Sequence, residues 1–194
     1  MTTDRKISPL WQQILTANKN FVANHEVLNS EPVSKYPQRN LAVLACMDTR
    51  LLDFLEPAMG IVRGEAKIIK VAGNTFVGTF DAVIGSLMVA VYELHVEEII
   101  VIGHDECGMM GTSAASLSAK MAERGINATD IKALQPKLEN WADGFKDVKA
   151  SVLETVNRLR KNPYLPKDIR ISGAIIHPHT GVIDLLDAGL EENK

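Results

Sequence analysis

Five side chains capable of chemistry follow two short apolar runs of the sequence: Cys46, Asp48, Arg50, His104 and Cys107. The first run, residues 41–46, ends at the first of these cysteines, and the second run, residues 98–103, ends just before the histidine. Short apolar runs between polar residues are typical of buried parallel strands. Ligands of open α/β sheets bind beyond the carboxyl ends of such strands. We therefore expect all five side chains at one edge of a sheet.

The residue types at these two strand ends point to zinc. Zinc prefers cysteine sulfur and histidine nitrogen, and a catalytic site keeps three protein ligands and one open position. Cys46, His104 and Cys107 supply that set. Two thiolates neutralise the dication, so a zinc-bound hydroxide makes the site anionic and requires help from nearby groups. Arg50 can hold the carboxylate of Asp48 in a fork, and Asp48 can then accept a hydrogen bond from zinc-bound water.

Other chemistries fit the spacing less well. A phosphatase-type thiolate needs its arginine farther away, round a phosphate loop, whereas only Asp48 and its neighbours separate Cys46 from Arg50. Residues 73–78 have the glycine spacing of a phosphate loop, but Thr79 and Phe80 follow where lysine and a hydroxyl residue are required.

A disulfide between the two cysteines would suit a secreted chain. The amino terminus has no apolar leader segment, which favours reduced thiols and a cytoplasmic protein.

The elements that position these residues alternate between strand and helix. Further strands are expected at 66–73, 169–176 and 182–186, and helices at 8–29, 76–95, 112–125, 131–141 and 148–161. This alternation predicts a single α/β domain, residues 1–194, with a mostly parallel central sheet flanked by helices. The first helix would form an N-terminal arm. Asn74 and Thr75 are the expected cap of the helix at 76–95, whose apolar residues cover almost all sides. We expect that helix at a subunit interface.

Composition limits the class of protein. The 194 residues are 46% hydrophobic and 23% charged, which is ordinary for one globular domain. The net charge of −3 gives no electrostatic basis for binding nucleic acid or an anionic membrane. No apolar run approaches the roughly 20 residues of a membrane span. His177 and His179 flank a proline after the strand at 169–176; a second metal site there is possible, although turn histidines more often face solvent.

The motif Cys46-x-Asp48-x-Arg50 with His104-x-x-Cys107 resembles the β-class carbonic anhydrases, most closely the short branch found in archaea and many bacteria. The resemblance is strong over residues 41–111 and weaker over 165–186. It implies the β-carbonic-anhydrase fold, Zn²⁺ bound by the two cysteines and the histidine, a catalytic Asp48–Arg50 pair, and a homodimer as the smallest unit. In some members the aspartate occupies the fourth zinc position. The chain departs from the family pattern at Val71 and at Asp105-Glu106.

The predicted function is that of a zinc lyase, a carbonic anhydrase, which hydrates carbon dioxide reversibly to bicarbonate and a proton by zinc-bound hydroxide. Hydrolysis of carbon disulfide or carbonyl sulfide on the same scaffold is an alternative within enzymes, because the ligand motif does not separate the two activities. A structural or regulatory protein that binds zinc without turnover is the alternative from another class. The expected partners are small molecules and further copies of the chain, as a homodimer or a higher homo-oligomer.

Overall fold

The computed structural model describes residues 8–24 and 32–189. The chain divides into two compact units at residue 33. The first contains one described element, the helix α1 (Pro9–Asn24), which buries none of its residues within this chain. Its exposed apolar side chains are Leu10, Trp11, Ile14, Leu15, Phe21 and Val22. The sequence predicted a helix over 8–29; its last five residues lie outside the described ranges.

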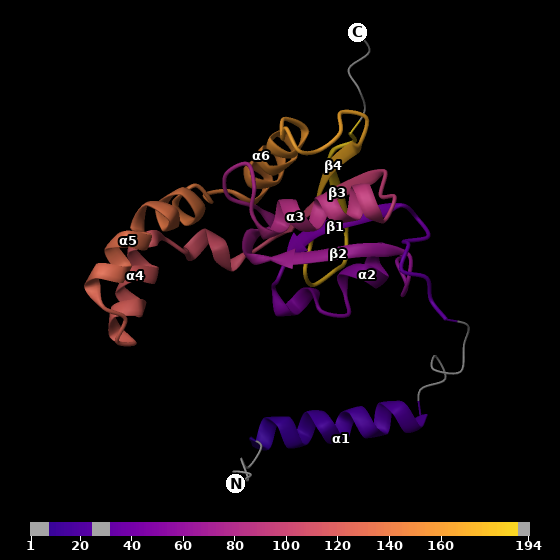
Figure 1. Cartoon of the computed structure of the whole chain (residues 1–194), viewed down its shortest axis with the longest axis horizontal. Helices are drawn as coiled ribbons and strands as arrows, with labels where there is room; N and C mark the ends of the chain where they lie inside the picture. Colours follow the sequence, from indigo (N-terminus) through magenta and orange to yellow (C-terminus); the bar gives the residue numbers. More distant parts are fainter. Residues whose placement is uncertain (1–7, 25–31, 190–194) are drawn as a thin grey trace. The chain divides into compact units, whose positions relative to one another are not determined.

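The second unit is built on a five-stranded sheet, shown in Figure 1. Its strands are β1 (Leu41–Cys46), β2 (Ala66–Val71), β3 (Glu98–His104), β4 (Arg170–Ile176) and β5 (Ile183–Asp187). They lie in the order β2-β1-β3-β4-β5, and only β5 runs antiparallel to its neighbour. All six residues of β1 are buried, as its apolar sequence predicted. The predicted α/β class and mostly parallel sheet are confirmed.

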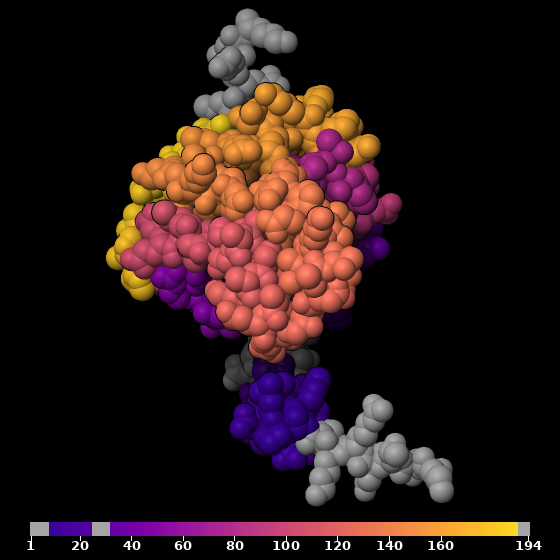
Figure 2. All heavy atoms as spheres, turned by 90° about the vertical axis from the view of Figure 1, so that its left-hand side faces the viewer, coloured from indigo at the N-terminus to yellow at the C-terminus, as the bar shows by residue number. Residues whose placement is uncertain are grey.

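Helices and short helical turns connect the strands and flank the sheet. They are η2 (Thr49–Leu51), α2 (Leu55–Ala58), η3 (Ala72–Asn74), α3 (Ala82–Met88), η4 (Val89–Glu93), η5 (Gly108–Gly111), α4 (Ala114–Glu123), α5 (Ala128–Leu138), η6 (Glu139–Asp143) and α6 (Val148–Arg160). Helices α4, α5 and α6 form much of the surface seen in Figure 2. No helix among the described residues is long and apolar enough to cross a membrane.

The helix expected over residues 76–95 begins later and has a different cap. Asn74 has a left-handed backbone (φ 47°) and Thr75 an extended one (φ −130°), so neither begins a helix. Asp81 does so instead, because its carboxylate accepts hydrogen bonds from the backbone N–H groups of Val83 and Ile84. The helix then continues as a π-helical turn, η4. The cap therefore depends on where the backbone enters the helix, because Asn and Asp are about equally good capping residues.

Helix α6 packs closely against the sheet where two strands have glycine. A Cβ atom added to Gly103 of β3 would lie 2.7 Å from Val152 and 2.9 Å from Val148. One added to Gly173 of β4 would lie 3.0 Å from Val152. These glycines therefore let α6 approach β3 and β4 at a distance that larger residues would prevent. Since Gly103 directly precedes His104, this packing also fixes the end of the strand that carries the histidine.

Candidate metal centre

The parallel pairing of β1 with β3 brings Cys46 and His104 to one edge of the sheet. Ala45 pairs with Ile102, so Cys46 lies level with Gly103 and next to His104. Cys107 follows β3 after a short turn and begins η5, where its carbonyl accepts a hydrogen bond from the backbone of Met110. The three side chains thus come from two neighbouring strand ends, as the sequence predicted.

The geometry of these three side chains suits a metal ion. One ligand atom from each of Cys46, His104 and Cys107 lies within 4.8 Å of the other two, and the two sulfurs are 3.8 Å apart. The exposed fraction is 4% for each cysteine and zero for the histidine. His104 Nδ1 lies 2.8 Å from the carbonyl oxygen of Asp105, which can only accept, so Nδ1 carries the proton. That tautomer leaves Nε2 as a free acceptor.

His104 Nε2 has no hydrogen-bond partner although it is buried. A buried polar atom without a partner is costly, and native proteins rarely contain one without a reason. A cation held between this nitrogen and the two sulfurs supplies the missing interaction. The chemistry of the donor set, two sulfurs and one imidazole nitrogen, is that of a zinc site with an open fourth position. These residues therefore fit zinc.

The electrostatics of the cluster favour a thiolate. Hydrogen bonding from Cys107 lowers the pKa of Cys46 to about 4, against the effect of burial and with help from His104 and nearby backbone N–H groups. The same hydrogen bond raises the pKa of Cys107, as does burial. Burial opposes the charged form of His104, but contact with the Cys46 thiolate outweighs it and raises the pKa of the imidazole. A dication favours the deprotonated form of all three ligands.

Asp48 and Arg50 form a tight pair beside the cluster. Arg50 donates from Nε to Asp48 Oδ1 and from Nη2 to Oδ2, both at 3.0 Å, and its backbone N–H also donates to Oδ1 at 2.9 Å. The hydrogen bonds from the guanidinium lower the pKa of Asp48 to about 2. Asp48 Oδ2 lies 3.7 Å from His104 Nε2. An ionised carboxylate, which can only accept hydrogen bonds, therefore lies next to the open side of the cluster.

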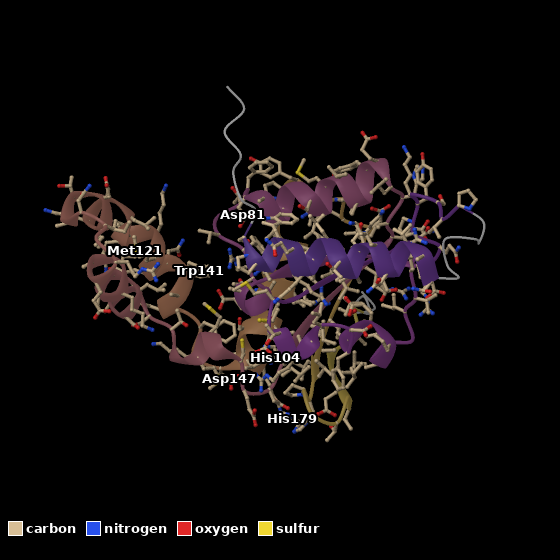
Figure 3. The ribbon with its side chains drawn as sticks, turned by 90° about the horizontal axis from the view of Figure 1, so that it is seen from below. Asp81, His104, Met121, Trp141, Asp147 and His179 are labelled. Atoms are coloured by element: carbon tan, nitrogen blue, oxygen red, sulfur yellow. The ribbon has the colours of Figure 1, made fainter. Side chains whose placement is uncertain are left out.

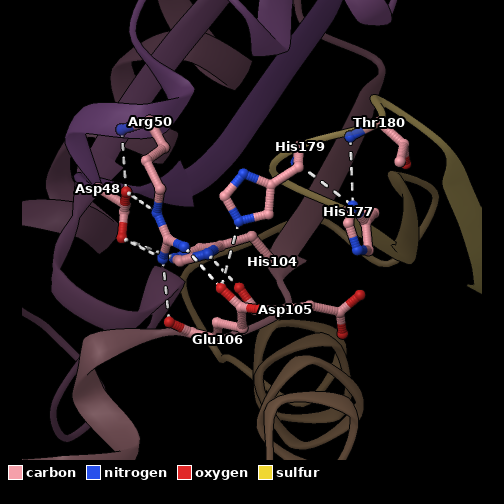
Figure 4. A network of polar contacts seen from close by, with 8 residues as sticks. All are labelled: Asp48, Arg50, His104, Asp105, Glu106, His177, His179 and Thr180. Carbon is pink, nitrogen blue, oxygen red and sulfur yellow. Dashed lines mark hydrogen bonds and ion pairs between the residues drawn. The ribbon is translucent and has the colours of Figure 1, made fainter.

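Glu106 and His179 complete this network, which Figure 4 shows. From the sequence, Glu106 was named as a departure from the family pattern and His179 as part of a possible second metal site, but neither residue was placed beside Arg50. Glu106 accepts a hydrogen bond from Arg50 Nη1 through its carboxylate, at 3.0 Å, and another from Nη2 through its backbone carbonyl, also at 3.0 Å. His179 Nε2 lies 3.4 Å from the same carboxylate. Contacts with His179 and with Arg50 lower the pKa of Glu106. The available sign in the sequence was position, because both residues lie in the turns that follow neighbouring strands, β3 and β4.

His177 and His179 do not form a second metal cluster. Their rings pack edge to face, with centroids 5.7 Å apart, on the turn that follows β4. Figure 3 shows His179 there and His104 within the fold. In the parts of the chain that the structure describes, one group of at least three His, Cys, Asp or Glu side chains is close enough to hold a metal ion. It consists of Cys46, His104 and Cys107.

Known proteins resemble this chain over most of its length. A family model described as carbonic anhydrase matches residues 41–183. The protein YvdA of Bacillus subtilis (strain 168) is 40% identical over 183 residues, which cover 92% of this chain and 91% of YvdA. The solved structure of β-carbonic anhydrase isoform I from Trichomonas vaginalis superimposes with a TM-score of 0.88 and 41% identity, covering 95% of this chain and all of that one. A carbon disulfide hydrolase of Acidithiobacillus thiooxidans is 32% identical over 155 residues, covering 74% of this chain and 75% of the hydrolase.

Proposed function

Because this chain belongs to the carbonic anhydrase family, in its β class, we propose that it catalyses the reversible hydration of carbon dioxide to bicarbonate and a proton. The proposal includes zinc as the cofactor, with Cys46, His104 and Cys107 as its ligands. One observation carries it: the buried His104 Nε2 has no hydrogen-bond partner and lies among two cysteine sulfurs and an ionised carboxylate.

Zinc at this position would lower the pKa of a water molecule toward about 7 and so supply a nucleophile at neutral pH. The chain's own residues would do the rest. Asp48 would accept a hydrogen bond from a proton-bearing nucleophile beside the cluster and so fix its orientation. It can serve as an acceptor because Arg50 keeps it ionised. Arg50 would also restrain the carboxylate from moving into the open metal position, since the fork of hydrogen bonds holds both of its oxygens.

Hydrolysis of carbon disulfide is the second candidate, favoured by the similarity to the Acidithiobacillus thiooxidans enzyme. Both substrates are linear and apolar, and the same three ligands and Asp48–Arg50 pair would serve either reaction. A non-catalytic zinc protein is supported less, because a structural zinc site needs closed coordination and has no use for an ionised carboxylate held beside it.

A stopped-flow assay of carbon dioxide hydration, run beside an assay of sulfide release from carbon disulfide, tests the proposal. The zinc-loaded protein should hydrate carbon dioxide far faster than it releases sulfide. Faster turnover of carbon disulfide would move the assignment to the second candidate. Turnover of neither substrate would leave a zinc-binding protein without this activity. The same preparation should contain about one zinc per chain by elemental analysis.

We also propose that the protein works in the cytoplasm, as a homodimer or a larger homo-oligomer. Both cysteines are free of disulfides and both belong to the metal cluster, so function requires a compartment that keeps thiols reduced. The exposed apolar side chains of α1 support assembly. Two β-carbonic anhydrases from Sordaria macrospora, whose structures have been solved, are described as tetrameric. This chain is 15% identical to the one compared, so the similarity extends to the fold alone.

A further inference from the structure

Arg50 is bound by two carboxylates, and its pairing with Asp48 uses only part of the guanidinium. The Nε and Nη2 edge faces Asp48. Nη1 donates to the Glu106 carboxylate, and Nη2 also donates to the Glu106 carbonyl. Two neighbouring edges of the planar group, which share Nη2, are therefore held by two different partners. With both partners in place, the side chain of Arg50 is 32% exposed and that of Glu106 is 63% exposed.

Glu106 is itself fixed in place by the metal-binding segment. It lies between the ligands His104 and Cys107, in a left-handed backbone conformation (φ 58°) that turns the chain toward Cys107. The preceding residue, Asp105, donates its backbone N–H to the carbonyl of Ile176 on β4, at 3.2 Å. The segment between the two ligands is thus tied to the sheet.

The turn after β4 also contacts the Glu106 carboxylate. His179 contacts it, and the turn that carries His179 is ordered by hydrogen bonds. His177 Nδ1 accepts from the backbone N–H groups of His179, at 3.3 Å, and Thr180, at 3.2 Å. The N–H of Gly181 donates to the His177 carbonyl at 3.0 Å. Figure 4 shows this series of contacts running from the turn through Glu106 and Arg50 to Asp48.

We propose that Glu106 is a positioning residue for the candidate reaction: it holds the Nη1–Nη2 edge of the Arg50 guanidinium, next to the edge that binds Asp48, and so fixes the carboxylate of Asp48 beside the metal ligands. The inference rests on the proposed function for its effect on catalysis, and on the contacts of Arg50 for its physical basis. Outer-shell residues at metal sites typically contribute about 10–100-fold to metal affinity or activity. We expect an effect near the lower limit, because the Glu106 carbonyl also accepts from Arg50 and remains in any variant.

The first test compares the rates and zinc contents of three variants. Glu106→Ala removes the carboxylate and should lower the carbon dioxide hydration rate roughly 10-fold with zinc content unchanged. Glu106→Gln keeps a neutral acceptor at the same length and should retain an intermediate rate. Glu65→Gln is the matched control, because Glu65 also pairs with an arginine, Arg39, at 2.9 Å, but away from the cluster. Loss of zinc in Glu106→Ala would overturn the proposal, since the residue would then act on the ligands.

A second measurement does not depend on activity. NMR of the zinc-loaded protein should show a slowly exchanging signal from the Arg50 Nη1 hydrogens, identified by its absence in Arg50→Lys. Glu106→Ala should lose that signal, and Glu65→Gln should keep it. If the wild-type protein hydrates no carbon dioxide, the proposed function fails, but this signal still decides whether Glu106 holds Arg50. A signal that persists in Glu106→Ala overturns the inference, whatever happens to the rate.

A double-mutant cycle tests whether the effect passes through Arg50. In an Arg50→Gln background, Glu106→Ala should cause no further loss of rate, because the group that it positions is already absent. Equal losses in both backgrounds would show that Glu106 acts independently of Arg50 and would overturn the proposal. A wild-type rate in Glu106→Ala, together with loss of the Nη1 signal, would also overturn it, since the contact would then have no catalytic consequence.

Discussion

Arg50 keeps Asp48 charged and correctly oriented, and His104 lies beside this pair. Arg50 binds both carboxylate oxygens, and His104 Nε2 lies 3.7 Å from one of them. A shorter or less rigid cation could neutralise Asp48 without fixing it, because lysine has no planar fork of donors. The proposed catalytic role therefore depends on the shape of the Arg50 side chain as well as on its charge.

Substitutions of this pair should reduce turnover without releasing zinc. Arg50→Lys keeps the charge but loses the fork, and Asp48→Asn keeps the size but places a donor beside the nucleophile. We expect each to lower the hydration rate about 10²–10⁴-fold, the usual cost of removing an orienting or acid–base group. Steady-state hydration and zinc content of both variants provide the measurement. Rates near wild type in both would mean that the pair has no catalytic role.

The ligand assignment makes a separate prediction about metal content. Cys107→Ser replaces a thiolate by a poor zinc ligand in a buried site, so the purified variant should lose most of its zinc. Elemental analysis gives the result, and circular dichroism shows whether the fold persists. Ser113→Ala is a suitable control, because it alters a helix cap in the following segment and no ligand. Full zinc occupancy in Cys107→Ser would exclude this cysteine as a ligand.

Among the elements, β1 was predicted well because burial on both faces leaves a continuous apolar run. The strand predicted at 41–46 has the same bounds as β1. Its neighbours in a parallel sheet end at the same edge, which is why the site could be predicted there. Helix starts were predicted less well. Asn74 and Thr75 are common capping types, but the tertiary structure places Asn74 in a left-handed turn. Asparagine is common both as a cap and in left-handed turns, so its type alone did not separate the two. The contact between Glu106 and His179 needs the pairing of β3 with β4, which a pattern along one chain does not specify.

The close approach of α6 to β3 makes Gly103 sensitive to substitution. Gly103→Ala would place a Cβ atom 2.7 Å from Val152 and 2.9 Å from Val148, and these branched side chains have little freedom to move. We expect a loss of about 1–3 kcal/mol in the free energy of unfolding, measured by urea denaturation. Gly144→Ala is the control, since its Cβ would meet no atom within 4 Å and its φ is −74°. Equal stability of the two variants would contradict close packing at Gly103.

The end of α6 is joined to β5 by an ion pair that should depend on pH. Arg160 donates to both oxygens of Asp187, at 2.8 and 2.6 Å. These hydrogen bonds lower the pKa of Asp187, against the effect of burial. A carboxyl group with a lowered folded-state pKa contributes stability above its ordinary pKa of about 3.9, and loses it as the pH falls through the folded value.

Asp187→Asn should therefore be less stable than the wild type at pH 7, and the difference should shrink as the pH falls below about 4. Urea denaturation of both proteins at neutral and acidic pH measures this difference. Asp184→Asn serves as a control for the loss of charge, because Asp184 lies in the same strand at an exposed position. A stability difference that does not change with pH would contradict the role of the ionised carboxylate.

At the scale of the whole molecule, exposed apolar side chains predict self-association. α1 exposes Trp11 by 56% and Val22 by 60%, and the segment from α3 into η4 exposes Val89 by 52%. Burying apolar surface contributes about 25 cal/mol per Å². A stable interface usually buries at least about 1,000 Å² in total. These surfaces are suited to an interface between copies of the chain.

Light scattering should show a dimer or a larger oligomer at micromolar concentration. Trp11→Glu places a charge in the apolar stripe of α1 and should shift the population toward smaller species. Asn20→Glu adds the same charge on the opposite side of that helix and should leave the assembly unchanged. A stable, active wild-type monomer at micromolar concentration would contradict the predicted assembly.

The 3.8 Å between Cys46 and Cys107 has a consequence for folding, because 61 positions of the chain separate the two sulfurs. A cation bound by both is a non-covalent cross-link that closes a long loop, and it can form only after β1 and β3 have paired. Binding to the folded chain alone raises the free energy of unfolding by about 4 kcal/mol when free metal exceeds its dissociation constant 1,000-fold. A chelator such as EDTA should therefore lower the thermal midpoint of the protein, and added zinc should restore it, whereas Cys107→Ser should respond to neither.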